Sequence, residues 1–297
     1  MLKIGDIEIH LINDCTVMVD GGGAFGLVPR KLWQRYFTPD ENNLIPMTQA
    51  CLYVKAGGKN IVVDTGTGTK LNDKARKISS IHGEGGLIRG LAKLGIQPED
   101  IDLVIDTHLH GDHCGGNTSW DKDGNIIPTF PNAEYVVQKR EYEDAMQPNE
   151  RTAATYFPMN YEPLVKNGQM RLLEGDTEFL PGITGIVTPG HTPGHMSVRF
   201  ESNGEHAAFL CDMASYAVHF ERLGWMTAYD IEPIRTLETK RIWQQWALEA
   251  DAILIFPHDA KRPVGRLKQT DGKHALLEPV DEPFVNQEDY PVLMQNA

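Results

Sequence analysis

Short apolar runs separated by glycine, proline and charged residues recur along this chain, and their lengths are those of β-strands. Residues 1–10 alternate between apolar and polar positions, as a half-buried strand does. Residues 51–56 and 60–64 flank a pair of glycines, which predicts a β-hairpin. A mostly apolar run predicts a buried strand at residues 101–105. Similar runs predict further strands at residues 133–138, 183–187, 196–200, 206–211 and 252–257.

Two segments between these runs have helical patterns. Residues 86–94 predict a short helix. Pro233 suits the first position of a longer helix, because proline there loses no helical hydrogen bond. Apolar residues in that helix recur at positions i, i+3, i+4 and i+7, which predicts core packing rather than a cofactor site. These residues are Trp243, Trp246, Ala247 and Ala250.

Two other segments have no regular period. Residues 20–29 are rich in glycine and predict a flexible loop. They lack the Gly-Lys-Ser/Thr sequence of a phosphate-binding loop. Trp33, Tyr36 and Phe37 follow, and the pattern leaves open whether they line a pocket or cover the core. Residues 139–165 mix charged residues, tyrosines and prolines, which fits neither a simple helix nor a disordered tract.

Composition and charge narrow the protein class. The chain has 297 residues, of which 41% are hydrophobic, and we expect a single domain over residues 1–297. The net charge of −13 and the lack of a basic cluster argue against a nucleic-acid partner. No apolar run reaches the roughly 18 residues of a membrane span, and residues 1–10 lack the apolar core of a signal peptide. Four cysteines without disulfide or zinc-finger spacing fit a reducing compartment, so we expect a cytoplasmic protein without a membrane partner.

The stretch with the most chemical information is residues 107–116, Thr-His-Leu-His-Gly-Asp-His-Cys-Gly-Gly, directly after a predicted strand. Two histidines two positions apart point the same way in an extended chain. The glycine after them lets the backbone turn, so that the next two polar side chains face the same space. Neutral imidazoles and carboxylates are ligands of zinc and similar metals. The candidate ligands are His108, His110, Asp112 and His113.

More ligands should come from the ends of other strands, because a strand gives a ligand a rigid base. Three polar residues meet this condition. His191, Asp212 and His258 each lie where one of the predicted strands stops. We therefore expect these three side chains to complete the site.

The order of these motifs resembles that of the metallo-β-lactamase superfamily. The chain has a His-x-His-x-Asp-His block, a Pro-Gly-His-Thr-Pro-Gly-His block at residues 189–195, a later aspartate after a strand and a last histidine after another. Residues 60–66 match the early Asp-Thr-Gly turn of the family. The motifs are specific together, whereas any one alone would not be. The resemblance implies an α/β fold, namely an αββα sandwich of two mixed sheets flanked by helices.

The resemblance also implies a dinuclear metal centre. The expected ligands are His108, His110 and His191 on the first ion, Asp112, His113 and His258 on the second, and Asp212 between them. Zinc suits these donors, and cobalt, manganese and iron remain open. Two divalent ions that share one water lower its pKa, so a bridging hydroxide would be the nucleophile.

Asp112 and Tyr216 are the expected catalytic residues. Lactone-hydrolysing relatives place a tyrosine a few residues after the bridging aspartate, where it can stabilise a developing oxyanion. Here Tyr216 lies four residues after Asp212, one more than the pattern predicts. Tyr229 is the alternative donor.

Four neighbours of the expected ligands are not assigned to the metals. Asp64 is expected to orient the ligands from beneath. His195 is expected to support the site, since the first histidine of its block is the ligand in the family pattern. Cys114 and Cys211 are interpreted as buried small hydrophobic residues, with Cys211 on the face of its strand that points away from the site.

The leading hypothesis for function is a hydrolase of the lactonase-like branch, acting on a small molecule such as an N-acyl homoserine lactone, which implies quorum quenching. Organophosphate triester hydrolysis, as in methyl parathion hydrolase, and hydrolysis of other esters or thioesters are alternatives, because the same nucleophile attacks phosphorus or carbon. An iron-dependent oxidoreductase of the same fold is the alternative from another class. In lactonase-like members an insertion near residues 139–165 helps to shape the substrate cleft, and plain surface packing of this segment is the open alternative. A homodimer is also left open.

Overall fold

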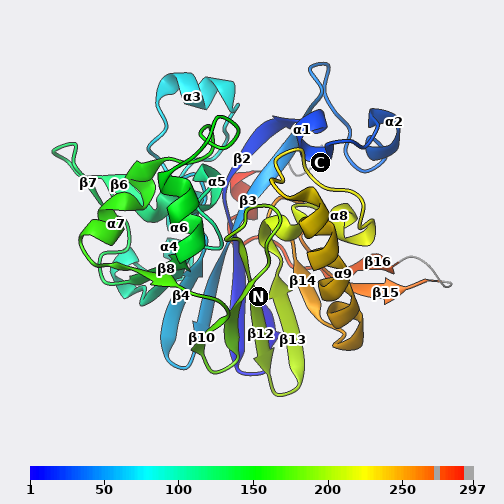
Figure 1. Ribbon diagram of the computed structural model, residues 1–297. Helices are drawn as coiled ribbons and strands as arrows, with labels where there is room; N and C mark the ends of the chain where they lie inside the picture. Colours follow the sequence, from blue (N-terminus) through cyan, green and yellow to red (C-terminus); the bar gives the residue numbers. More distant parts are fainter. Residues whose placement is uncertain (271–274, 291–297) are drawn as a thin grey trace.

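Two β-sheets pack face to face with helices on their outer sides (Figure 1). The computed structural model describes residues 1–270 and 275–290. This arrangement is the αββα sandwich expected from the sequence, and both sheets are mixed. The fold prediction is therefore confirmed.

The first sheet has the strand order β1-β2-β3-β4-β5-β8-β9. Its first four strands are antiparallel, and β4, β5, β8 and β9 are parallel. The strands are β1 (Leu2–Ile4), β2 (Ile7–Asp20), β3 (Leu44–Ala56), β4 (Lys59–Val63), β5 (Leu103–Ile105), β8 (Glu134–Gln138) and β9 (Met170–Leu173). A separate two-stranded sheet contains β6 (Thr118–Trp120) and β7 (Ile126–Pro128).

The second sheet follows sequence order from β10 to β16, and its only parallel pair within the described residues is β13 with β14. The strands are β10 (Thr177–Leu180), β11 (Ile183–Val187), β12 (Met196–Ser202), β13 (Glu205–Phe209), β14 (Ile253–Ile255), β15 (Val264–Gln269) and β16 (Ala275–Pro279). A strand is present at each predicted apolar run, but residues 1–10 contain β1 and the start of β2, which continues to Asp20, and β3 begins at Leu44, before the predicted residue 51.

The helices cover the outer faces of the sheets and the ends of the strands (Figure 1). They are α1 (Gly21–Phe25), α2 (Arg30–Trp33), α3 (Asp73–Ile78), α4 (Gly86–Lys93), α5 (Gly111–Cys114), α6 (Lys139–Met146), α7 (Glu162–Lys166), α8 (Ala217–Glu221) and α9 (Pro233–Glu249). Short 3-10 helices lie at Pro98–Asp100, Gly115–Asn117, Pro158–Asn160, Cys211–Ala214 and Gln287–Asp289. The helices predicted at residues 86–94 and after Pro233 are confirmed.

The central strands are buried on both faces, which explains why they are continuous apolar runs rather than alternating ones. In β14, Ile253 and Ile255 pack into the core between the sheets, whereas Leu254 packs into the cluster beneath α9. In β5, Ile105 faces the central core and Val104 faces the cluster beneath α4 and α6. The layers follow from this two-sided burial.

The prediction of a flexible loop at residues 20–29 is wrong in its first half, where α1 forms. Asp20 caps this helix by accepting a hydrogen bond from the backbone N–H of Gly22 at 2.6 Å. Phe25 is fully buried, and its ring stacks on that of Trp33 with 5.2 Å between centroids. The cap and this packing offset the poor helix propensity of the glycines. The aromatic residues after the glycine run thus cover a core cluster.

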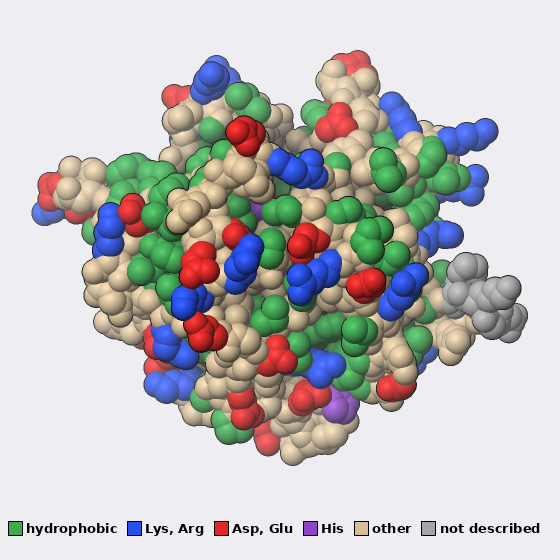
Figure 2. Space-filling view, in the orientation of Figure 1, with side chains coloured by type: hydrophobic (Ala, Val, Ile, Leu, Met, Phe, Trp, Pro, Cys, Tyr) green, Lys and Arg blue, Asp and Glu red, His purple; other side chains and the backbone are tan. Residues whose placement is uncertain are grey.

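In Figure 2, acidic and basic side chains are interspersed over the middle of the face shown, and several basic side chains gather along the upper right edge, near α2. Among residues 1–270 and 275–290, no helix combines the length and the apolar character needed to cross a membrane.

Lys240 on α9 gives stability a pH dependence that can be tested. It is fully buried and donates to the carbonyls of His219 at 3.1 Å and Trp225 at 2.6 Å. Burial lowers its pKa to about 8. The unfolded chain keeps this proton up to about pH 10.4, whereas the folded protein loses it above about pH 8. The free energy of unfolding therefore rises with pH between these two values. Relative to Lys240→Met, the wild-type protein should gain about 2 kcal/mol of unfolding free energy between about pH 7 and about pH 9.5.

Urea unfolding at the two pH values measures this difference. The exposed Lys74 provides the control, since Lys74→Met removes the same charge from the surface. An equal pH dependence in both variants would contradict the prediction.

Candidate metal centre

The strands bring the expected ligands to one edge of the sandwich. In the first sheet β4 and β5 are parallel, so Asp64 and residues 107–116 leave the sheet at the same edge. In the second sheet β13 and β14 are parallel. β11 has the same direction, because one antiparallel strand separates it from β13. His191, Asp212 and His258 follow these three strands, so each ligand leaves a strand at its carboxyl end.

Three histidines form the first group of donors. One ring nitrogen each of His108, His110 and His191 lies within 4.8 Å of the others. The distance from His110 Nδ1 to His191 Nε2 is 3.1 Å. The rings of His108 and His110 are inclined at 75° with 4.6 Å between centroids, so they are not stacked. All three side chains are buried.

Asp112, His113 and His258 form the second group, again with one donor atom each within 4.8 Å. Asp212 lies between the two groups. Its Oδ2 is 3.2 Å from His191 Nε2 and 3.5 Å from His113 Nε2. Its Oδ1 is 3.0 Å from His258 Nε2. The structure thus brings all seven predicted residues together, with one carboxylate in contact with both groups.

The charge states suit cation binding. Burial, followed by the neighbouring imidazole of His191, lowers the pKa of His110 to about 3. Burial also lowers the pKa of His108 well below its usual value. Burial opposes ionisation of Asp212, but the imidazoles of His258 and its neighbours hold the pKa of this carboxyl well below its usual range. His108 and His110 are therefore neutral and Asp212 is ionised, the states that bind metals. Burial opposes protonation of His113 and His191 as well, but neighbouring groups, Asp212 among them, raise the pKa of both, so a metal would have to displace their protons.

Two buried ring nitrogens without hydrogen-bond partners indicate that a metal fits this site. Nε2 of His108 and Nε2 of His113 are buried and have no hydrogen-bond partner among residues 1–270 and 275–290. Buried polar side-chain atoms are nearly always bonded, so these two nitrogens require a partner. Both residues belong to groups of converging donors. Imidazole and carboxylate donors in this arrangement fit zinc or a similar divalent ion.

Comparison with known proteins agrees with this geometry. Residues 44–260 match the metallo-beta-lactamase superfamily. The chain belongs to this superfamily. An N-acyl homoserine lactonase from Bacillus sp is 32% identical over 184 residues, which are 61% of this chain but only 65% of that protein. An N-acyl homoserine lactonase from Bacillus cereus is 28% identical over 235 residues, 75% of this chain and 86% of that protein.

The superfamily fold is also found in solved structures. A probable metal-dependent hydrolase from Staphylococcus aureus aligns with a TM-score of 0.85 and 30% identity. The alignment covers 94% of this chain and 99% of that one. The family and the fold expected from the motifs are therefore confirmed.

Beneath the candidate site, Asp64 holds His113. Its Oδ2 is 2.9 Å from His113 Nδ1, and the same carboxylate accepts the backbone N–H of Thr107 at 2.8 Å. His195 supports Asp212, because its Nε2 accepts the backbone N–H of Asp212 at 3.1 Å. Such contacts fix both the tautomer and the orientation of ligands.

Two further supports were missed by sequence reasoning. Asp230 Oδ1 is 2.9 Å from His191 Nδ1 and accepts the hydroxyl of Thr227 at 2.8 Å. His258 Nδ1 is 2.7 Å from the backbone carbonyl of Thr48. Asp230 belongs to no motif, and Thr48 contributes only its main chain. The one available signal was general, namely that each ligand histidine needs an acceptor for its other ring nitrogen.

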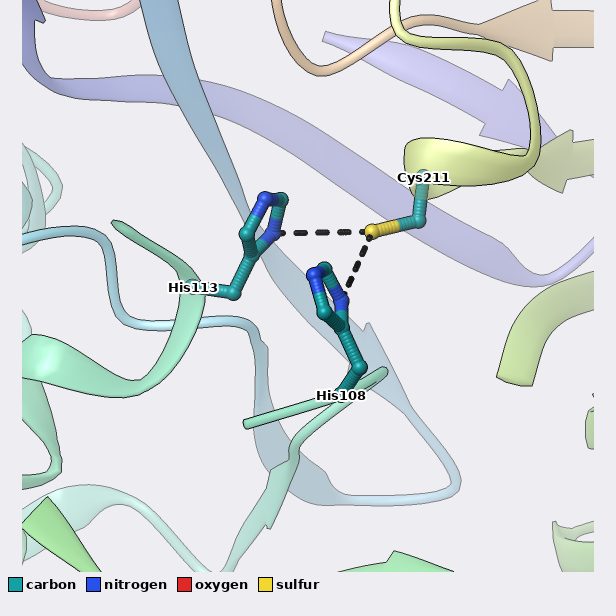
Figure 3. A group of neighbouring side chains, drawn as sticks. All are labelled: His108, His113 and Cys211. Atoms are coloured by element: carbon teal, nitrogen blue, oxygen red, sulfur yellow. Dashed lines mark hydrogen bonds between the residues drawn. The ribbon is translucent and has the colours of Figure 1, made fainter. Parts of the chain in front are cut away.

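The interpretation of Cys211 as pointing away from the site is wrong, although the residue is buried as expected. Figure 3 shows its sulfur directed at the rings of His108 and His113. Sγ lies 3.8 Å from His108 Nδ1 and 3.5 Å from His113 Nδ1, and 2.9 Å from the hydroxyl of Thr107. These are the nitrogens opposite the orphaned Nε2 atoms, so Cys211 supports the rings from behind. Cys211 continues the alternation of Ala207 and Phe209, which also face the core between the sheets. The left-handed φ of 49° at Cys211 and the 3-10 helix that begins there turn the chain, so Asp212 reaches the same site instead of the opposite face.

Tyr216 and Tyr229 both line a cavity of about 160 Å³ that also contacts five of the seven ligands, His110, Asp112, His191, Asp212 and His258. Tyr216 is buried, and its hydroxyl has no hydrogen-bond partner in the described part of the chain. Burial raises the pKa of this hydroxyl well above its usual value, so it remains a proton donor. Tyr229 is 46% exposed and lies nearer the solvent.

A second cavity of about 370 Å³ adjoins the first and shares Asp112 with it. Its walls are largely apolar and include Val17, Val19, Met47, Leu71, Phe157 and Met159. Gly111 permits the close approach of one wall, because a Cβ there would lie 2.6 Å from the ring of Phe157. Part of the segment 139–165 thus lines this cavity next to the ligands.

Proposed function

We propose that this chain is a metal-dependent hydrolase that opens lactone rings, with N-acyl homoserine lactones as its substrate class. The observation that carries the proposal is the arrangement of seven donors, all buried except the partly exposed Asp112, in two groups that share Asp212 at the wall of a cavity. The names of the similar lactonases support the choice of substrate.

Two zinc ions would be held by His108, His110 and His191, by Asp112, His113 and His258, and by Asp212 between them. When bound, such a pair of ions acidifies water and polarises the carbonyl that is attacked. Tyr216 would donate its proton to the carbonyl oxygen as negative charge develops there. Asp112 lines both cavities, so its carboxylate can take the proton of the hydroxyl group that attacks the carbonyl and pass it to the alkoxide oxygen that leaves when the ring opens.

The apolar cavity supports an acyl-substituted substrate over a bare lactone. Its volume of about 370 Å³ is in the range of small-molecule sites, and its walls suit a hydrocarbon tail. Each buried methylene of such a tail contributes about 0.8 kcal/mol. Affinity should therefore rise with acyl length until the cavity is filled.

A substrate panel on the zinc-loaded protein tests the proposal. The panel contains N-acyl homoserine lactones of increasing acyl length, unsubstituted lactones, paraoxon-type triesters, thioesters and nitrocefin. We expect the highest kcat/KM for the acyl homoserine lactones and about two equivalents of zinc per chain. A higher kcat/KM for triesters or thioesters would overturn the assigned substrate, and iron with redox activity would overturn the hydrolase.

A further inference from the structure

Glu141 is a buried carboxylate for which the proposed reaction has no use. It lies on α6, is fully buried and forms no ion pair within residues 1–270 and 275–290. Three donors surround it. Oε1 accepts the backbone N–H of Leu109 and the hydroxyl of Tyr156, each at 3.1 Å, and Oε2 accepts the hydroxyl of Thr192 at 2.6 Å. A buried carboxylate is costly, so its place in the fold needs a reason.

The three donors all adjoin residues of the first ligand group. Leu109 lies between His108 and His110. Thr192 directly follows His191. Glu141 therefore connects two chain segments that are 83 positions apart, the separation of Leu109 and Thr192, at the point where each presents a ligand.

Tyr156 provides a further connection between Glu141 and the first ligand group, through His110. Its backbone forms an isolated antiparallel bridge with His110, and its ring centroid lies 5.1 Å from that of His110. Through its hydroxyl, Tyr156 is hydrogen-bonded to Glu141, and through its backbone it is paired with His110. Tyr156 thus ties His110 to the same carboxylate that binds Leu109.

The backbone around Glu141 leaves it little freedom to move. A Cβ on Gly194 would lie 2.4 Å from the backbone nitrogen of Glu141, so the loop that carries His191 packs directly on the first turn of α6. A rigid base and three directed hydrogen bonds are what a residue needs to hold ligands at fixed separation. A purely structural carboxylate would have no reason to contact both ligand segments.

We propose that Glu141 is a positioning residue that sets the separation between the His108–His110 segment and His191, and so the affinity of the first ligand group for metal. The inference rests on the proposed function only in taking these histidines as ligands. It does not depend on the substrate. Supporting groups of this kind typically change metal affinity by about 10-fold to 100-fold.

Three variants separate the hydrogen bonds of Glu141 from its charge. Glu141→Met fills a similar volume but releases all three donors. Glu141→Gln loses the charge, yet its oxygen can still accept from Leu109 and Tyr156 while its amide donates to the hydroxyl of Thr192. Glu143→Met is the matched control, because Glu143 lies on the same helix and is exposed.

The readouts are the visible spectrum of the Co²⁺-loaded protein and zinc affinity by competition with a chromophoric chelator. We expect Glu141→Met to alter the Co²⁺ spectrum and to weaken zinc binding about 10-fold to 100-fold. Glu141→Gln should stay close to the wild type in both, and Glu143→Met should match it. Wild-type spectrum and affinity in Glu141→Met, or equal losses in both glutamine and methionine variants, would overturn the inference.

A variant that removes a single donor guards against misfolding of Glu141→Met. Thr192→Val deletes only the hydroxyl that Oε2 accepts, and it should weaken zinc binding about 3-fold to 10-fold while the protein stays folded at a somewhat lower melting temperature. Unchanged zinc affinity in Thr192→Val would count against the inference by itself. If instead the wild-type protein binds neither Co²⁺ nor zinc, the proposed function fails, and the two failures are thereby distinguished.

Discussion

Replacing Asp212 with alanine should lower kcat/KM for the best lactone substrate by about 1,000-fold or more and reduce the zinc content of the purified protein. Asp212 is the one carboxylate in contact with His191, His113 and His258 in the described structure. Its loss separates the two groups of donors and leaves the imidazoles without their anionic partner. Metal-ion catalysis contributes several kcal/mol to such reactions, and each 1.36 kcal/mol is a factor of about ten in rate.

The control for Asp212→Ala is a buried carboxylate remote from the chemistry. Asp14 accepts the backbone N–H groups of Leu87 and Gly68 at 3.1 and 3.0 Å and lines neither cavity. Asp14→Ala therefore controls for the stability lost when a buried carboxylate is removed, and the folded variant should retain zinc. Metal analysis and steady-state kinetics provide the measurements. An Asp212→Ala protein with full zinc content and wild-type activity would exclude the shared-carboxylate arrangement.

The candidate ligands could be predicted because their residue types suit metals and their positions follow predicted strands. Each follows an apolar run whose length is that of a buried strand. The end of such a strand is held rigidly by the sheet. The direction of β13 and β14 then places Asp212 and His258 at one edge of the sheet. No knowledge of side-chain contacts was needed for this step.

The supporting residues could not be predicted in the same way. Glu141 lies on α6 and Asp230 lies between α8 and α9, and neither stretch of sequence contains a motif. Their hydrogen-bond partners come close only when distant segments pack. Thr48 acts through a carbonyl that every residue possesses. The prediction for Cys211 was wrong because the chain turns at its left-handed backbone, so Cys211 and Asp212 reach the same site rather than opposite faces. Local patterns thus locate the ligands, whereas tertiary packing determines what orients them.

Removing the hydroxyl of Tyr216 should lower kcat for lactone hydrolysis by about 100-fold with little change in KM. The Tyr216 ring is held by Phe25, at 5.6 Å between centroids, and by Phe37, at 5.0 Å. Tyr216→Phe retains this packing, so the variant loses only a donor whose hydroxyl has no partner elsewhere in the described chain. A preorganised donor to a developing oxyanion contributes about 3 kcal/mol, and it acts in the transition state rather than on bound substrate.

Tyr229→Phe is the matched comparison, since Tyr229 lines the same cavity from its more exposed side. An exposed hydroxyl exchanges hydrogen bonds with water and gains little when charge develops, so this variant should lose less than about fivefold in kcat. Steady-state kinetics on one substrate and equal zinc contents make the comparison valid. If Tyr229→Phe shows the large loss and Tyr216→Phe does not, the oxyanion donor is Tyr229. In that case the position four residues after Asp212 serves packing alone.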